Sequence, residues 1–162
     1  MAISLSKRPT KNMTVKERIE KCRTGEELSL VAKLPSGWFC LSELQPVTGH
    51  IAYGVLYADP IALGFNALTP ARRAQWGIDS GTCGDALIEV LGALRANYET
   101  WGNVDPSLHT HITARFESEP AHLRVKTPRD AYDWSKGQAL DFSTSEVQSI
   151  LLRLKSHIES RT

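Results

Sequence analysis

Two of the five histidines in this chain, His109 and His111, stand two residues apart within a run rich in β-branched residues. Because side chains alternate along a β-strand, both imidazoles would project from one face, roughly 6–7 Å apart. The same alternation adds Thr113 and Arg115 to that face. A neutral imidazole is a good nucleophile near neutral pH, since its unperturbed pKa is about 6.5. We therefore expect this strand face to carry nucleophilic and acid–base chemistry.

Two other interpretations of the histidine pair stay open at this point. The two imidazoles could be structural, hydrogen-bonded in a core or at the surface. They could also supply two ligands of a zinc site, which His50, His122 or a carboxylate would have to complete. Nothing in the spacing of these residues requires a third ligand, so the spacing by itself does not favour a zinc site.

The elements that must position these histidines are short strands and helices with clear end signals. Strand-like composition and alternation occur over five stretches: residues 28–33, 37–44, 50–58, 94–101 and 108–116. Thr14 and Glu17 have the spacing of a capping box at the start of a first helix, which Thr24-Gly25 would end. Thr69-Pro70 starts a long helix, about residues 70–91, which Gly92 would end. Ser143 or Thr144 caps a final helix.

These elements predict an α+β fold: one antiparallel sheet of four to six strands, with the long helix and the C-terminal helix packed on it. Residues 1–12 are polar and basic, and we expect a flexible arm there. Residues 13–142 would form the domain itself, in which residues 120–142 lack clear periodicity and would be a long loop over the sheet. Residues 143–162 would be a C-terminal helix packed on the same domain.

The bulk composition is that of an ordinary globular domain, with 41% hydrophobic and 23% charged residues among 162. A net charge of +1 indicates neither a nucleic acid nor a membrane surface as partner. Cys22, Cys40 and Cys83 are odd in number and lack CxxC spacing, which argues against a disulfide framework and suits a reducing compartment. The sequence has no secretory signal pattern and no apolar run near the ~20 residues of a membrane span, so we expect a cytoplasmic protein.

The histidine strand resembles the motif of the histidine triad (HIT) superfamily, whose members hydrolyse or transfer nucleotides. That motif is a histidine, an apolar residue, a second histidine, any residue and a third histidine. His109 and His111 match the second and third histidines, and Arg115 matches the arginine that often follows. Ser107 replaces the first histidine, which in the family helps to orient the nucleophile.

Five further segments carry the resemblance. Gly49-His50 stands where the family has a Gly-His pair after a proline turn. Asn97 looks like the asparagine of the preceding strand, and Asn103 sits where the family has a polar amide before the motif. Pro35-Ser36-Gly37-Trp38 and Tyr132-Asp133-Trp134 look like a bacterial HIT-like subgroup related to diadenosine tetraphosphate hydrolases.

The resemblance implies a HIT-like fold and a set of catalytic residues. His109 would attack an α-phosphorus and form a nucleotidyl-histidine, which water then resolves. His111 would donate a hydrogen bond to a phosphate oxygen or to the leaving group, and Ser107 would add its hydroxyl. The chemistry would need no metal and no other cofactor.

The resemblance also implies how substrate and partner are bound. The expected substrate-binding residues are Asn97, Asn103, Arg115 and His50. For Arg115, pairing with Glu99 or Glu117 is an equal alternative, and His50 could merely open a strand. A homodimer is expected, formed through the sheet and the long helix, with Cys83 and the glycines near it at the contact.

We therefore expect a nucleotide hydrolase or nucleotidyl transferase, acting on dinucleoside polyphosphates or nucleoside phosphoramidates. The alternative is a catalytically weak or inactive nucleotide-binding module that acts as a sensor or scaffold. The replacement of the first histidine by Ser107 is the feature that keeps this alternative open.

Overall fold

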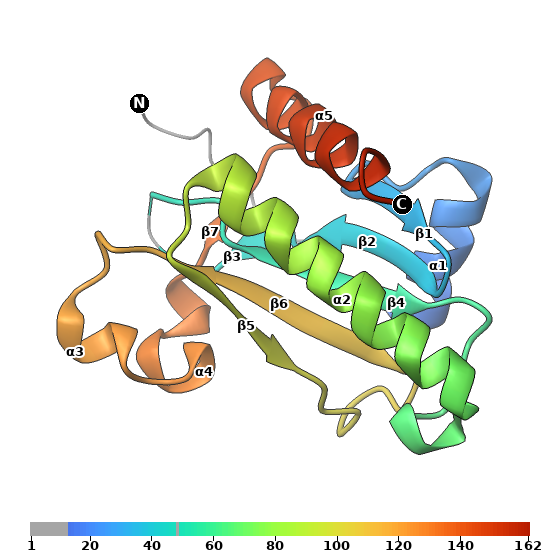
Figure 1. Ribbon diagram of the computed structural model, residues 1–162. Coiled ribbons are helices and arrows are strands. Elements are labelled where there is room, and N and C mark those ends of the chain that lie inside the picture. Colours follow the sequence, from blue (N-terminus) through green and yellow to red (C-terminus); the bar gives the residue numbers. More distant parts are fainter. Residues whose placement is uncertain (1–12, 48) are drawn as a thin grey trace.

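Five antiparallel strands form the central sheet of the computed structural model, which describes residues 13–47 and 49–162 (Figure 1). The predicted arm, residues 1–12, lies outside the described residues. The spatial order of the strands is β1 (Leu30–Leu34), β2 (Gly37–Leu41), β4 (Tyr53–Ala58), β6 (His109–Arg115) and β5 (Arg95–Glu99). This confirms the predicted α+β fold with an antiparallel sheet.

The predicted helix ends are confirmed at three helices. Helix α1 (Val15–Thr24) begins with the capping box of Thr14 and ends at a left-handed Gly25. Helix α2 (Pro70–Leu91) is capped by Thr69 and ends at a left-handed Gly92. Helix α5 (Ser145–Glu159) is capped by Thr144. None of the helices in the described part of the chain combines the length and apolar character of a membrane span.

Helices α2 and α5 cover one face of the sheet, and α1 lies behind it (Figure 1). The core under α2 includes Ile112 and Ala114 of β6, both fully buried. Gly84 lets strand β5 come close, because a Cβ built there would lie 1.9 Å from the Tyr98 hydroxyl. Cys83 is also fully buried, so the expectation that it lies at a subunit contact is wrong.

The strand predicted over residues 50–58 begins later, at Tyr53, because a side chain takes part of its hydrogen bonding. The buried Gln45 side-chain oxygen accepts hydrogen bonds from the backbone N–H groups of Ala52 (2.8 Å) and Tyr53 (2.7 Å). Gln45 itself belongs to the short strand β3 (Leu44–Gln45), which pairs with β7 (Gln138–Ala139). This second, two-stranded sheet closes one end of the domain.

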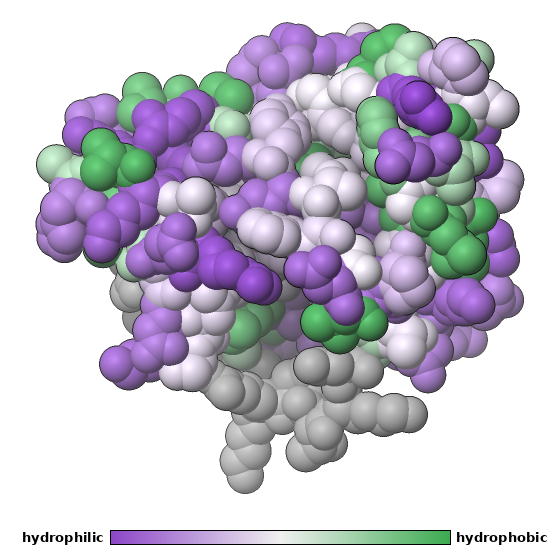
Figure 2. All heavy atoms as spheres, turned by 90° about the horizontal axis from the view of Figure 1, so that it is seen from below, coloured by the Kyte–Doolittle hydropathy of each residue, from purple (hydrophilic) through white to green (hydrophobic). Residues whose placement is uncertain are grey.

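The long loop predicted for residues 120–142 is instead a chain of short elements. It contains α3 (Ala121–Arg124), α4 (Pro128–Ala131), the 3₁₀ turn η2 (Trp134–Lys136) and β7; a further turn, η1 (Phe65–Ala67), precedes α2. Elements of three or four residues are too short to produce a visible hydrophobic period, which is why composition alone predicted a loop. Figure 2, which looks at the molecule from below Figure 1, shows hydrophilic side chains over much of the surface and hydrophobic ones in separate patches.

Arg115 fastens this segment to the sheet. Its guanidinium is fully buried and pairs with the buried Glu119 at 2.9 Å. Its remaining N–H groups donate to the Asn97 side-chain oxygen (3.1 Å) and to the carbonyl oxygens of Leu123 (2.9 Å) and Lys126 (2.8 Å). Burial of Glu119 opposes its ionisation, but hydrogen bonds from Arg115 and other donors lower the pKa of Glu119 overall. Glu119, and neither Glu99 nor Glu117, is thus the partner of Arg115.

This network predicts a large stability effect. Arg115→Ala leaves Glu119 charged and buried without its partner, so we expect the free energy of unfolding to fall by about 3–5 kcal/mol. Glu119→Gln keeps the shape of the side chain and some of its hydrogen bonds, so the free energy of unfolding should fall by less. Lys136→Ala is the matched control, because its pair with Asp133 is exposed and should contribute about 0–1 kcal/mol. Urea denaturation measures all three, and equal losses in Arg115→Ala and Lys136→Ala would contradict the role of Arg115.

Candidate active site

The histidine pair lies on the face of the sheet opposite α2. In the strand register His109 stands beside Tyr57, and His111 beside Val55 on one side and Glu99 on the other. The two imidazole centroids are 4.8 Å apart and the rings are nearly perpendicular. Both predicted catalytic histidines are therefore side by side on one strand face, as the two-residue spacing requires.

Helix α1 covers one end of this face. Cys40 of β2 stands opposite Val55 in the sheet, so it points to the same side as His111. The Cys40 Sγ lies 3.6 Å from the Sγ of Cys22, which is on α1. The helix thus packs beside the histidines, and the two cysteines that are far apart in the sequence are in contact.

A backbone carbonyl holds His109. Its Nδ1 lies 2.7 Å from the carbonyl oxygen of Ser107, which can only accept a hydrogen bond. The proton therefore sits on Nδ1, and Nε2 keeps the lone pair that a nucleophile needs. Within residues 13–47 and 49–162, Nε2 forms no hydrogen bond.

Asp105 in turn positions Ser107. Its carboxylate accepts the backbone N–H of Ser107 and that of Val15, each at 2.9 Å, and so joins the histidine strand to the start of α1. Burial opposes the ionisation of Asp105, but these hydrogen bonds and one from the Ser107 hydroxyl lower its pKa. Ser107 therefore contacts His109 through its carbonyl, while its hydroxyl is a partner of Asp105.

Tyr53 holds the second histidine. The Tyr53 hydroxyl and the His111 Nδ1 form a short hydrogen bond, and the edge of Trp134 packs against the Tyr53 ring. Burial raises the pKa of Tyr53, so the phenol keeps its proton. Burial, followed by the charges of His109 and Arg129, lowers the pKa of His111 to about 4. A phenol that donates to Nδ1 leaves His111 neutral with an N–H at Nε2, a hydrogen-bond donor.

Two charged residues near the pair were not predicted as site residues. Glu99 faces the same side as His111, and burial raises its pKa. Arg129, on α4, is exposed and its guanidinium lies 5.3 Å from the centroid of the Trp101 ring. The alternation of β5 could have indicated Glu99. Nothing in the sequence could have indicated Arg129, because its position depends on the folded segment after β6.

Two of the predicted substrate-binding residues are elsewhere. The His50 ring stacks on Phe116 at 4.1 Å, and its Nε2 lies 3.0 Å from the Ser118 hydroxyl. Phe116 follows His109 by seven residues, which is about 20 Å along a strand, so His50 is far from His109. Arg115 uses all five N–H groups within the protein and has none for a ligand.

The two predicted asparagines have different environments. The Asn97 side-chain oxygen accepts from Arg115, while its amide nitrogen forms no hydrogen bond within the described residues. Asn103 is exposed in the turn before β6. No three His, Cys, Asp or Glu side chains in the described part of the chain cluster closely enough to hold a metal ion, so the zinc interpretation gains no support.

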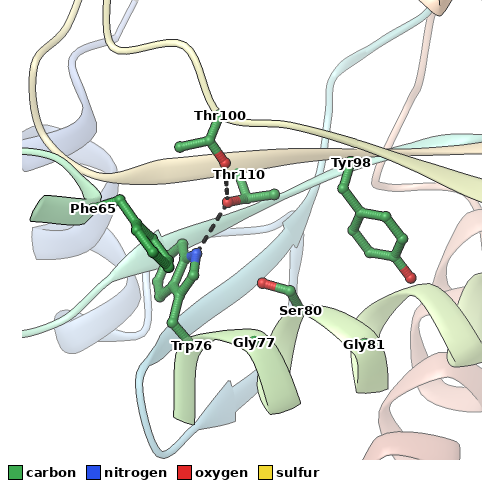
Figure 3. Close-up of a pocket in the computed structure, with 8 residues that line it drawn as sticks. All are labelled: Phe65, Trp76, Gly77, Ser80, Gly81, Tyr98, Thr100 and Thr110. Atoms are coloured by element: carbon green, nitrogen blue, oxygen red, sulfur yellow. Dashed lines mark hydrogen bonds between the residues drawn. The ribbon is translucent and has the colours of Figure 1, made fainter. Parts of the chain in front are cut away.

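A cavity of about 350 Å³ lies on the other face of the sheet, between α2 and strands β5 and β6 (Figure 3). Its wall includes Thr110, which alternates with the histidines and accepts a hydrogen bond from the Trp76 indole (3.1 Å). The Ser80 hydroxyl points toward this cavity and has no hydrogen-bond partner among the residues that the structure describes (Figure 3). Because Thr110 and His109 point to opposite sides of β6, this cavity is separate from the histidine site.

The environment of His111 predicts a pH dependence of stability. Its pKa is about 4 in the folded protein and about 6.5 when unperturbed, so the unfolded chain binds more protons between these values. The free energy of unfolding should therefore fall as the pH decreases from about 6.5 to about 4. NMR titration of the imidazole measures the pKa, and His111→Asn should reduce the pH dependence. A His111 that titrates near 6.5, with the same pH dependence in both proteins, would contradict this.

The comparisons with known proteins bear on the fold. No protein-family model and no curated protein sequence matches the chain. A histidine triad protein of Bradyrhizobium japonicum is similar in structure, with TM-score 0.64, 22% identity, and 84% of this chain and 94% of that chain covered. A histidine triad protein of Marinobacter aquaeolei VT8 is also similar, with TM-score 0.62, 18% identity, and 82% of this chain and 90% of that chain covered.

A hypothetical histidine triad nucleotide-binding protein of Sulfolobus tokodaii is also similar, with TM-score 0.60, 12% identity, and 88% of this chain and 91% of that chain covered. Identities this low speak for the fold alone. The chain therefore has the fold of the histidine triad proteins.

Proposed function

We propose that this protein is a member of the histidine triad superfamily and a nucleotide hydrolase or nucleotidyl transferase, with His109 as its nucleophile. The observation that supports this most directly is the tautomer of His109. Its Nδ1 proton is held by the Ser107 carbonyl, and its Nε2 is free beside His111. An imidazole held in this way is ready to attack an electrophile without first losing a proton.

The reaction would proceed in two displacements. The Nε2 lone pair of His109 attacks the α-phosphorus, a phosphorus–nitrogen bond forms, and the bond from phosphorus to the leaving group breaks. The imidazole becomes cationic, and the Ser107 carbonyl and the Asp105 carboxylate favour that charge. Water then attacks the phosphorus and loses a proton to the solvent, while the phosphorus–nitrogen bond breaks and its electron pair returns to Nε2, which releases the nucleoside monophosphate.

The neighbouring groups would bind and orient the phosphate. The Nε2–H of His111 donates to a phosphate oxygen or to the leaving atom, and the Tyr53 hydroxyl behind it fixes that tautomer. The Asn97 amide nitrogen and Asn103 are the neutral donors we assign to non-bridging oxygens. Positioning and electrostatic stabilisation carry most of the catalysis in transfers at phosphorus. The proposed substrates are dinucleoside polyphosphates or nucleoside 5′-phosphoramidates.

A second candidate function is a nucleotide-binding module that acts as a sensor or scaffold. The observation that favours it is Ser107, which stands where the histidine triad motif has its first histidine. A serine hydroxyl bound to Asp105 cannot act as an imidazolium does. Binding without turnover would support this candidate.

Replacement of the nucleophile separates the two candidates. His109→Ala should reduce mononucleotide release from adenosine and guanosine phosphoramidates and dinucleoside polyphosphates by about 10³-fold or more. His122→Ala is the matched control, because His122 is exposed on α3 and should retain wild-type release. Chromatography measures the product, and mass spectrometry of the quenched wild type should detect a nucleotidyl adduct on His109. Full activity in His109→Ala would refute the proposed nucleophile, and tight binding without any turnover would favour the module.

The proposed homodimer would form through the free edge of β5 and the neighbouring side of α2. Ile78 on α2 is 62% exposed, and Leu94, just before β5, is 50% exposed. Because β5 is an edge strand of the five-stranded sheet, pairing of the β5 backbones of two copies would contribute to the contact.

Light scattering tests this assembly. The wild type should have twice the chain mass, and Ile78→Glu should have the mass of one chain, because it places a charge in the contact. Leu152→Glu on α5, at a residue 64% exposed, is the matched control and should remain a dimer. A wild type with the mass of one chain at micromolar concentration would contradict the homodimer.

A further inference from the structure

The arginines around the histidine face differ in whether their charge is available. Arg115 is fully buried and paired with Glu119. Arg18 on α1 is paired with Glu27 at 2.8 Å and lies 3.4 Å from Glu43. Arg129 is different: within residues 13–47 and 49–162 its guanidinium forms neither a hydrogen bond nor an ion pair. It is an exposed and unpaired cation at the rim of the site.

The segment that carries Arg129 is fixed next to the histidines by three contacts. The Tyr132 hydroxyl donates to Glu119, and the edge of Trp134 packs against Tyr53 with 5.1 Å between ring centroids. At the other end of the helix, Arg115 donates a hydrogen bond to the carbonyl oxygen of Lys126 (2.8 Å). Arg129 therefore sits on a short helix whose two ends are positioned by neighbouring structure.

The charge of Arg129 reaches three groups of the site face. Burial is the main cause that lowers the pKa of His111 and raises those of Glu99 and Tyr53, and the charge of Arg129 lowers all three. Within the described residues, Arg129 forms no ion pair with Glu99. Its guanidinium contacts the ring of Trp101 instead, 5.3 Å from the ring centroid. The guanidinium is thus close to the chemistry, oriented by a ring, and free to bind an anion.

We propose that Arg129 binds the phosphate chain of the leaving group and thereby selects dinucleoside polyphosphates over nucleoside phosphoramidates. This inference rests on the proposed function. A guanidinium forms paired, charge-assisted hydrogen bonds with phosphate oxygens, so it stabilises a leaving group that carries negative charge. An amine leaving group offers no such acceptor.

The test compares two substrates in three proteins. Arg129→Gln should lower kcat/KM for diadenosine tetraphosphate by about 10–100-fold, mainly through KM, because one or two charge-assisted hydrogen bonds are lost. For adenosine 5′-phosphoramidate the decrease should be less than about threefold, since its leaving group has no phosphate. Arg124→Gln is the matched control in the same segment, where Arg124 pairs with Glu117 at 2.7 Å, and should leave the ratio of the two substrates at the wild-type value. Arg129→Lys should recover part of the loss.

Binding to a protein without its nucleophile separates this inference from the proposed reaction. Calorimetry with diadenosine tetraphosphate should give weaker binding to His109→Ala/Arg129→Gln than to His109→Ala, with unchanged thermal unfolding. If the wild type hydrolyses neither substrate, the proposed function fails, and weaker binding in the double variant still supports Arg129 as the phosphate-binding residue. Equal losses for both substrates, or equal binding by the two variants, would overturn the assignment.

Discussion

Alternate side chains of strand β6 pack into the core and line the histidine face, and the arrangement of the rest of the molecule depends on this alternation. Thr110, Ile112 and Ala114 face α2 and are buried, whereas His109 and His111 face the other side. A shift of one residue in the pairing of β6 with β4 would place both imidazoles in the apolar core and the core residues at the site. The hydrophobic core therefore determines the register of the histidines, so packing and chemistry are specified by the same interaction.

The buried pair of Arg115 and Glu119 determines which residues of the segment after β6 lie near the histidines. An arginine on the site face could have contacted a substrate, but a buried guanidinium must have all its donors satisfied. Glu119 and nearby carbonyl groups satisfy them, and in doing so they hold the segment after β6 against the sheet. That segment then supplies Trp134 and Arg129 to the site. Arg115 is therefore a structural residue, whereas Arg129 is exposed at the rim of the site.

The hydrogen bond that orients His109, the proposed nucleophile, uses the backbone of residue 107 and not its side chain. The Ser107 carbonyl accepts the Nδ1 proton of His109, and a carbonyl is present whatever the side chain. Asp105 accepts the backbone N–H of Ser107 and places a negative charge near the imidazole of His109. A serine side chain cannot supply an imidazolium, and His111 does not supply one at pH 7 either, because burial lowers the pKa of His111 to about 4.

The sequence by itself determined the features that depend on neighbouring residues. Local backbone geometry predicts the helix caps at Thr14 and Thr69, the limits of α2, and a third cap at Ser143 or Thr144. The two-residue period of a strand places His109 and His111 on one face. The tertiary structure decided the partner of Arg115, the distance of His50 from the site, the pKa of His111 and the position of Arg129. Each of these depends on burial or on contacts between segments far apart in the chain, and no local pattern encodes which charge finds which partner.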